Sequence, residues 1–146
     1  MTSMFLPFER AFDEETSSWC LIGRDRSGED FGVGAAADPD EAAGRLREWV
    51  LDSLLAAAGD GENRLGDLLG NCPPDQDCLV FGPPDLIPVM IRLLRARRGW
   101  RQSEVADRMG ISQQAYAKLE RPGTNPELQT LMRVERALGA PLLEYA

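Results

Sequence analysis

The stretch RQSEVADRMGISQQAYAKLE, residues 101–120, decides how the C-terminal part of the chain folds. Apolar residues recur at helical spacing on both sides of Gly110, which predicts one helix over 102–109 and a second over 112–121. Gly110 suits the left-handed residue that ends a helix, and Ser112 suits the N-cap of the next helix. The remaining apolar positions predict a buried seam between the two helices: Val105, Ala106, Met109, Ile111, Tyr116 and Leu119.

Two helices joined by such a short turn form a helix-turn-helix, in which the second helix enters the major groove of DNA. Four residues at its start are predicted to face outward together: Gln113, Gln114, Ala117 and Lys118. We expect both glutamines and Lys118 to read base edges, because glutamine pairs bidentately with adenine and lysine binds the acceptor edge of guanine. Gln102, at a helix N-terminus, is predicted to contact a backbone phosphate.

Further phosphate contacts are predicted for four residues near these helices: Arg98, Arg101, Ser112 and Arg121. Arg95 and Arg97 are candidates too, but a solvated helix side chain is an equally good interpretation of them. Flanking helices are predicted over Leu86–Arg98, with Asp85 as N-cap and Pro88 in the first turn, and over Glu127–Leu138, ending at Gly139. Residues 83–146 thus form an all-α domain in this interpretation.

The order Gln102-x-Glu104-Val-Ala106-x-x-Met-Gly110-Ile-Ser112-x-x-x-Tyr-x-x-Leu119-Glu120 resembles the five-helix Cro/phage-repressor (XRE) class of DNA-binding domain. The resemblance implies binding to a specific operator. Arg101 departs from it, because the family usually has a capping Thr or Ser there. Two recognition helices spaced by one turn of DNA would serve a palindromic operator, so we expect a homodimer or a higher even oligomer.

The N-terminal part has the pattern of a small β-meander followed by a helix. Strands are predicted over Met4–Phe12, Ser18–Arg24 and Phe31–Ala36, and Asp38 then Pro39 mark a helix start. Seven apolar residues at helical spacing are predicted to pack on the sheet: Ala42, Ala43, Leu46, Trp49, Val50, Leu54 and Ala57. Trp49 could instead anchor a partner. A helical turn over 65–69 and a strand over 78–81 are expected before the all-α domain. The chain is therefore α+β, with domains at 1–82 and 83–146.

The run Ile111-Ser-Gln-Gln-Ala-Tyr-Ala-Lys-Leu-Glu-Arg-Pro-Gly-Thr-Asn-Pro-Glu-Leu-Gln-Thr-Leu131 is similar to the domain attached to HicB antitoxins. That resemblance implies a partial RNase H-like N-terminal domain, a small basic HicA-like ribonuclease toxin as partner, and repression of the protein's own operon. Residues 1–84 carry 6 Arg against 17 Asp and Glu, a net −11, which suits a basic partner. Residues 85–146 carry 10 Lys and Arg against 7 acids, a net +3. A stand-alone XRE repressor whose N-terminal domain dimerises or senses a ligand is the alternative.

Composition limits the other classes of function. The chain has no histidine, and its acids cluster at turns, so we expect neither an enzyme nor a metal or cofactor site. Cys20, Cys72 and Cys78 are an odd number with no sign of export, so free thiols are expected. No apolar run approaches the roughly 20 residues that span a bilayer, and the N-terminus has no signal-peptide pattern. We therefore expect a cytoplasmic protein without a membrane partner.

Overall fold

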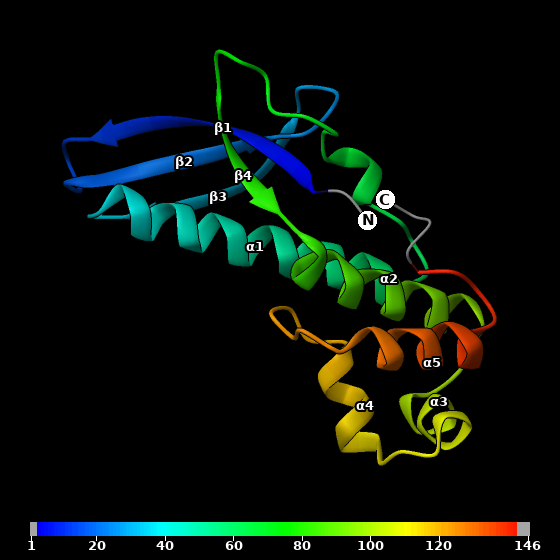
Figure 1. Ribbon diagram of the computed structural model, residues 1–146. Coiled ribbons are helices and arrows are strands. Elements are labelled where there is room, and N and C mark those ends of the chain that lie inside the picture. Colours follow the sequence, from blue (N-terminus) through cyan, green and yellow to red (C-terminus); the bar gives the residue numbers. More distant parts are fainter. Residues whose placement is uncertain (1–2, 143–146) are drawn as a thin grey trace. The chain divides into compact units, whose positions relative to one another are not determined.

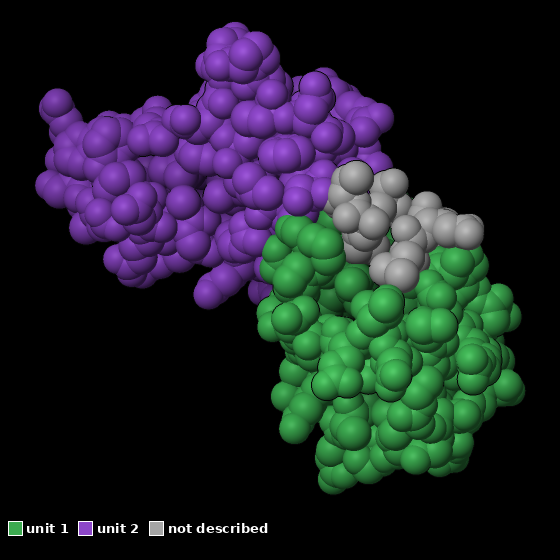
Figure 2. All heavy atoms as spheres, in the orientation of Figure 1, with its two compact units in different colours: residues 1–2, 54–63, 82–146 green, residues 3–53, 64–81 purple. Residues whose placement is uncertain are grey.

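The computed structural model describes residues 3–142 and divides the chain into two compact units (Figure 1, Figure 2). Among the described residues, the sheet unit contains residues 3–53 and 64–81, and the helical unit contains residues 54–63 and 82–142. Residues 54–63 lie in the same unit as the segment that starts at residue 82, and the domain bounds 1–82 and 83–146 stay a prediction. Residues 1–2 and 143–146, the outer ends of the two predicted domains, lie outside the described residues.

The sheet unit is built on a four-stranded antiparallel sheet in the order β3-β2-β1-β4. Its strands are β1 (Met4–Asp13), β2 (Ser18–Arg24), β3 (Asp30–Ala36) and β4 (Asp77–Phe81). Each predicted strand is confirmed to within one residue at either end, because alternating apolar residues bounded by turn-forming clusters identify a strand well. The helical turn predicted over 65–69 is a single 3-10 turn, η1 (Leu65–Asp67).

Acidic residues organise the two hairpin turns of the meander. The Oδ1 atom of Asp13 accepts the amide of Glu15 at 3.0 Å. The Oδ1 atom of Asp25 accepts the Ser27 hydroxyl at 2.7 Å and the amides of Ser27 and Glu29, each at 2.9 Å. The bond from the Ser27 hydroxyl is the main cause that lowers the pKa of Asp25. The prediction that these acids are turn residues is confirmed for Asp25, whereas Asp13 is the last residue of β1 and bonds to the turn from there.

Helix α1 (Pro39–Gly59) begins at the predicted N-cap, where Asp38 Oδ2 accepts the amide of Glu41 at 3.0 Å. It packs closely on β3 because Gly34 has no side chain. A Cβ atom at Gly34 would collide with the carbonyl oxygen of Ala42 and lie 2.5 Å from the amide nitrogen of Leu46. The buried side of α1 in the sheet unit then continues through Leu46 and Val50, both fully buried.

Trp49 is not a core residue, so that prediction was wrong. The side chain is 44% exposed, and its ring meets Phe31 edge-on with 6.1 Å between the centroids. The reason is positional: the buried side of α1 runs through Val50 and Leu51, which leaves Trp49 at the margin of the stripe beside Gly32. A periodic pattern gives the direction of a side chain only to within a fraction of a helical turn.

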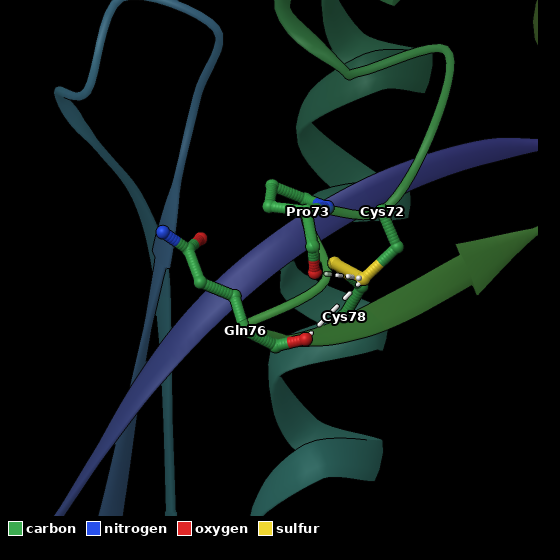
Figure 3. The surroundings of a disulfide bond; sticks show 4 residues. All are labelled: Cys72, Pro73, Gln76 and Cys78. Atoms are coloured by element: carbon green, nitrogen blue, oxygen red, sulfur yellow. Dashed lines mark hydrogen bonds between the residues drawn. A yellow bond between two sulfur atoms is a disulfide. The ribbon is translucent and has the colours of Figure 1, made fainter.

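The expectation of free thiols was wrong for Cys72 and Cys78, which form a disulfide (Figure 3). A turn brings them together, since the amide of Gln76 donates to the carbonyl of Pro73 at 3.2 Å and the Cα atoms of the cysteines lie 6.0 Å apart. The Cys72 Sγ atom also lies 3.5 Å and 3.4 Å from the carbonyl oxygens of Pro73 and Gln76. Cys20 is a free cysteine. Compartment and cysteine count, on which the prediction relied, carry no information on this local turn.

The helical unit contains the end of α1 and four further helices. They are α2 (Pro83–Arg97), α3 (Gln102–Met109), α4 (Gln113–Leu119) and α5 (Leu128–Leu138). α3 has the predicted bounds, and α5 ends at Gly139 in the left-handed conformation, as predicted. Asp85 is not the N-cap of α2: the cap is Gly82, because Pro83 supplies the fixed φ of a first helical position and has no amide to satisfy.

Because α2 starts two residues before Asp85, Pro88 lies inside the helix and not in its first turn. Proline has no amide proton, so the carbonyl of Pro84, four residues earlier, lacks its helical donor. The amide of Gly123 donates to that carbonyl at 3.1 Å instead. This bond attaches the loop between α4 and α5 to the start of α2.

Candidate DNA-binding site

The turn between α3 and α4 has the geometry that its sequence predicts. Gly110 adopts a left-handed φ of +69°, and the amide of Ile111 returns to the carbonyl of Ala106 at 3.0 Å. Ser112 is the N-cap of α4, and its hydroxyl accepts the amide of Ala115 at 3.1 Å. The two ends are thus fixed by local hydrogen bonds, which sets the angle between the helices.

The predicted seam between the two helices is buried at five of its six positions: Val105, Ala106, Met109, Tyr116 and Leu119. Ile111, in the turn itself, is only half-buried. The small side chain of Ala106, 1% exposed, lets the helices approach closely. The opposite side of α4 is consequently left to solvent.

The predicted base-reading side chains lie on that free side of α4. Gln113, Gln114 and Lys118 are all exposed. The two glutamines and Ala117 line a shallow surface hollow of about 350 Å³. The structure therefore brings the three polar side chains together on one helix face, and their contacts with bases stay a prediction.

Arg101 and Gln102 lie at the start of α3, where a phosphate contact is predicted. Arg101 is exposed and is the N-cap, but an arginine side chain has no acceptor to offer the helix. Only half of a capping pair forms: Glu104 Oε1 accepts the backbone amide of Arg101 at 3.3 Å. The uncapped helix amides and the half-buried Gln102 side chain point to a favourable place for an anion.

A buried carboxylate connects the start of α3 with α2 and α4. Glu120 is 1% exposed, and its two oxygens accept from Arg95 Nε at 2.7 Å and Arg95 Nη2 at 2.9 Å. Arg92 Nε lies 3.4 Å away, and Gln102 Nε2 donates to the same carboxylate at 3.5 Å. The network therefore orients Gln102, whose predicted role is to contact phosphate.

The charges in this network support one another. Burial by itself raises the pKa of Glu120, but the bonds from Arg95 and the other donors outweigh it and leave that pKa below its ordinary value. The bond to Glu120 raises the pKa of Arg95. Burial, followed by the negative charge of Glu120, raises the pKa of Tyr116. Glu120 is thus ionised and Tyr116 neutral at neutral pH.

The remaining predicted phosphate contacts are dispersed. Arg121 is exposed two residues after the end of α4, so it lies near the glutamines along the chain. Arg98 donates to the carbonyl of Gly139 at 3.3 Å and lies over the ring of Trp100, with its Cζ atom 5.4 Å from the centroid. Arg97 donates to the carbonyl of Gly61 at 3.2 Å. Arg95 has an internal partner, which favours a structural role over a phosphate contact.

Comparison with known proteins agrees with this geometry: a helix-turn-helix family model matches residues 91–145. The chain carries a helix-turn-helix domain of Cro/C1 (XRE) type. This domain supports a function as a DNA-binding transcription regulator. None of the curated proteins compared with the chain matches it. Among residues 3–142, no helix is long and apolar enough to cross a membrane.

The sheet unit has two hollows of its own. The first, about 650 Å³, is lined by residues of β1, the turn after β2 and the loop that the disulfide closes. The second, about 370 Å³, is lined by Ile22, Asp30, Gly32, Val33 and Trp49, and both Val33 (48%) and Trp49 (44%) are strongly exposed. No group of three acidic or cysteine residues able to hold a metal ion occurs within residues 3–142. Trp49 and Val33 were not predicted as an exposed apolar pair, because Trp49 was assigned to the core.

Proposed function

We propose that this protein is an antitoxin-like repressor that binds its operator through the helix-turn-helix domain and a small basic toxin through the sheet unit. The observation that carries the DNA-binding part is the exposed pair Gln113 and Gln114 at the start of α4, with Lys118 one turn later. Glutamine reads adenine bidentately and lysine reads guanine, so these three side chains would supply sequence preference. Catalysis is not part of the proposal.

Phosphate contacts would fix the register of this domain on the duplex. The proposed contacts are Arg101, Gln102, Ser112, Arg121 and Arg98. Residues 85–146 carry a net charge of only +3, which gives one domain a modest affinity for DNA. A homodimer, or a higher even oligomer, would place two α4 helices on a palindromic operator and raise the affinity.

The base-reading proposal is tested by selecting preferred sites from a pool of random duplexes. The double variant Gln113→Ala/Gln114→Ala should lose preference at the base pairs that the wild type selects, by about 1–3 kcal/mol for each bidentate pair removed. Its affinity for non-specific DNA should persist, because the phosphate contacts remain. Gln129→Ala is the matched control, since Gln129 is an exposed glutamine on α5. Selection of the same site by the double variant would refute the assignment.

The antitoxin part of the proposal rests on different support. The sequence resembles HicB antitoxins over residues 111–131, and residues 1–84 carry a net −11, which would favour a basic partner. Trp49 and Val33 would supply exposed apolar contacts in the same unit. The partial RNase H-like fold that the same resemblance implies stays a prediction. One feature favours the stand-alone regulator instead, because the Pro-Asp-x-Pro-Gly turn usual in HicB proteins does not occur before Asp38.

A tagged pull-down from the native host distinguishes an antitoxin from a stand-alone repressor. Recovery of a stoichiometric small basic protein with the wild type, and its loss with Trp49→Ala, would support the antitoxin. The double variant Gln113→Ala/Gln114→Ala is the matched control, and it should retain the partner. Purification of the protein without a partner, together with intact DNA binding, would support a stand-alone repressor whose sheet unit dimerises or senses a ligand.

A further inference from the structure

Three arginines of the helical unit surround a hollow that DNA reading by α4 does not use. The hollow has a volume of about 310 Å³ and is lined by Arg108, Met109, Arg133, Arg136 and Ala137. We call it the arginine pocket. It shares no residue with the hollow beside Gln113 and Gln114.

Two of the guanidinium groups are held in place by the fold. Arg133 Nη2 donates to the carbonyl of Met109, the last residue of α3, whose oxygen has no donor within its own helix. The Arg108 guanidinium lies over the ring of Trp100, with its Cζ atom 4.0 Å from the centroid. Both contacts leave N–H groups free, because a guanidinium has five donors and a stacked one keeps all of them. The two side chains therefore need little further ordering to bind an anion.

Among the described residues 3–142, none of those that line the pocket is negatively charged. Its five residues contribute three guanidinium groups and no carboxylate. Arg136 makes no hydrogen bond or ion pair with any residue in the described range 3–142. Arg133 and Arg136 are three residues apart on α5, a spacing at which like charges repel. An anion between them would offset that repulsion.

From these contacts we infer that the arginine pocket binds a phosphate group. Planar guanidinium groups match the oxygens of phosphate bidentately, and a hollow of about 310 Å³ is at the lower end of the size of small-molecule sites. The phosphate belongs either to the backbone of bound DNA or to a small phosphorylated molecule. The inference does not depend on the base-reading role of α4 or on a toxin partner, because it rests only on the end of α3 and on α5.

Titration of the full chain with inorganic phosphate at low ionic strength, followed by calorimetry, tests the inference. The double variant Arg108→Gln/Arg136→Gln should bind phosphate at least tenfold more weakly, and it leaves the Arg133 bond that stabilises the end of α3. The control Arg10→Gln/Arg45→Gln removes the same charge from exposed positions outside the pocket and should bind within twofold of the wild type. Circular dichroism establishes that both variants are folded.

Equal affinities in the wild type and the pocket variant would overturn the inference, and so would equally weakened binding in the two double variants. The source of the phosphate follows from the salt dependence of binding to a mixed-sequence duplex. If the pocket holds a DNA phosphate, the slope of log K against log salt decreases by about 0.9 for each phosphate that the pocket variant no longer neutralises. If the slope is unchanged while phosphate binding is abolished, the pocket serves a small phosphorylated molecule.

Discussion

Replacing Glu120 with glutamine should destabilise the helical unit by about 3–5 kcal/mol, the usual cost of removing one member of a buried ion pair. Three features of the structure place the site in that range. The Glu120 side chain is 1% exposed, Arg95 is 17% exposed, and two direct bonds of 2.7 Å and 2.9 Å connect them. Glutamine keeps the volume but leaves the Arg95 charge uncompensated. A unit of roughly 70 residues has a total stability of about 4–10 kcal/mol, so the loss is a large fraction of it.

Urea unfolding followed by circular dichroism at 222 nm measures the effect. The matched control is Asp77→Asn, because Asp77 accepts from Arg10 Nη2 at 2.7 Å while their side chains are 65% and 48% exposed. Water screens that pair, so its loss should cost only about 0–1 kcal/mol. Because the two ion pairs have bonds of similar length, comparison of the two variants shows how much of the stability loss is due to burial.

The difference in free energy of unfolding between the wild type and Glu120→Gln should also depend on pH, which gives a second check. The folded-state pKa of Glu120 lies below its ordinary value of 4.5, so the ionised carboxylate stabilises the fold above pH 4.5. That contribution is lost as the pH falls through the lowered folded-state pKa. The wild type and Glu120→Gln should therefore differ fully at pH 7 and converge in acid. A difference under about 1 kcal/mol at pH 7, or one equally large at pH 3, would refute a stabilising ionised pair.

Three further predictions concern stability. Gly34→Ala should lower the free energy of unfolding by about 1–3 kcal/mol or more, since the new Cβ atom meets the backbone of α1. Gly44→Ala, whose Cβ atom meets no atom within 4 Å, should raise it by about 0.5–1 kcal/mol. Thermal melts of the two variants measure both effects. Arg101→Ser should raise the free energy of unfolding by about 1 kcal/mol, because serine completes the cap of α3, and urea unfolding measures the change. Replacing Cys72 and Cys78 by serine should lower the free energy of unfolding by about 2 kcal/mol, because the unfolded chain is no longer restricted by a short closed loop. Thiol titration of the unreduced wild type should find one free thiol.

Local sequence signals determined most of the secondary structure of this protein and the position of α4, the second helix of the helix-turn-helix. The bounds of α3, the left-handed Gly110 and the Ser112 cap all follow from residues that interact within one helical turn. Such signals do not depend on the rest of the chain, so a single sequence is enough to find them. The same holds for Asp38 at the start of α1 and for the strands of the meander.

Only the tertiary structure decided which of these residues meet. Arg95 could be a phosphate contact or a solvated side chain by sequence, and the fold pairs it with Glu120, 25 residues away. The exposure of Trp49 and the Cys72–Cys78 bond were likewise set by packing and by a turn whose geometry composition does not encode. Long-range pairs depend on how whole elements pack, because a side chain's neighbours across the core come from distant parts of the chain. The grouping of Arg108, Arg133 and Arg136 around one hollow was also decided by the tertiary structure, because it depends on how α3 packs against α5.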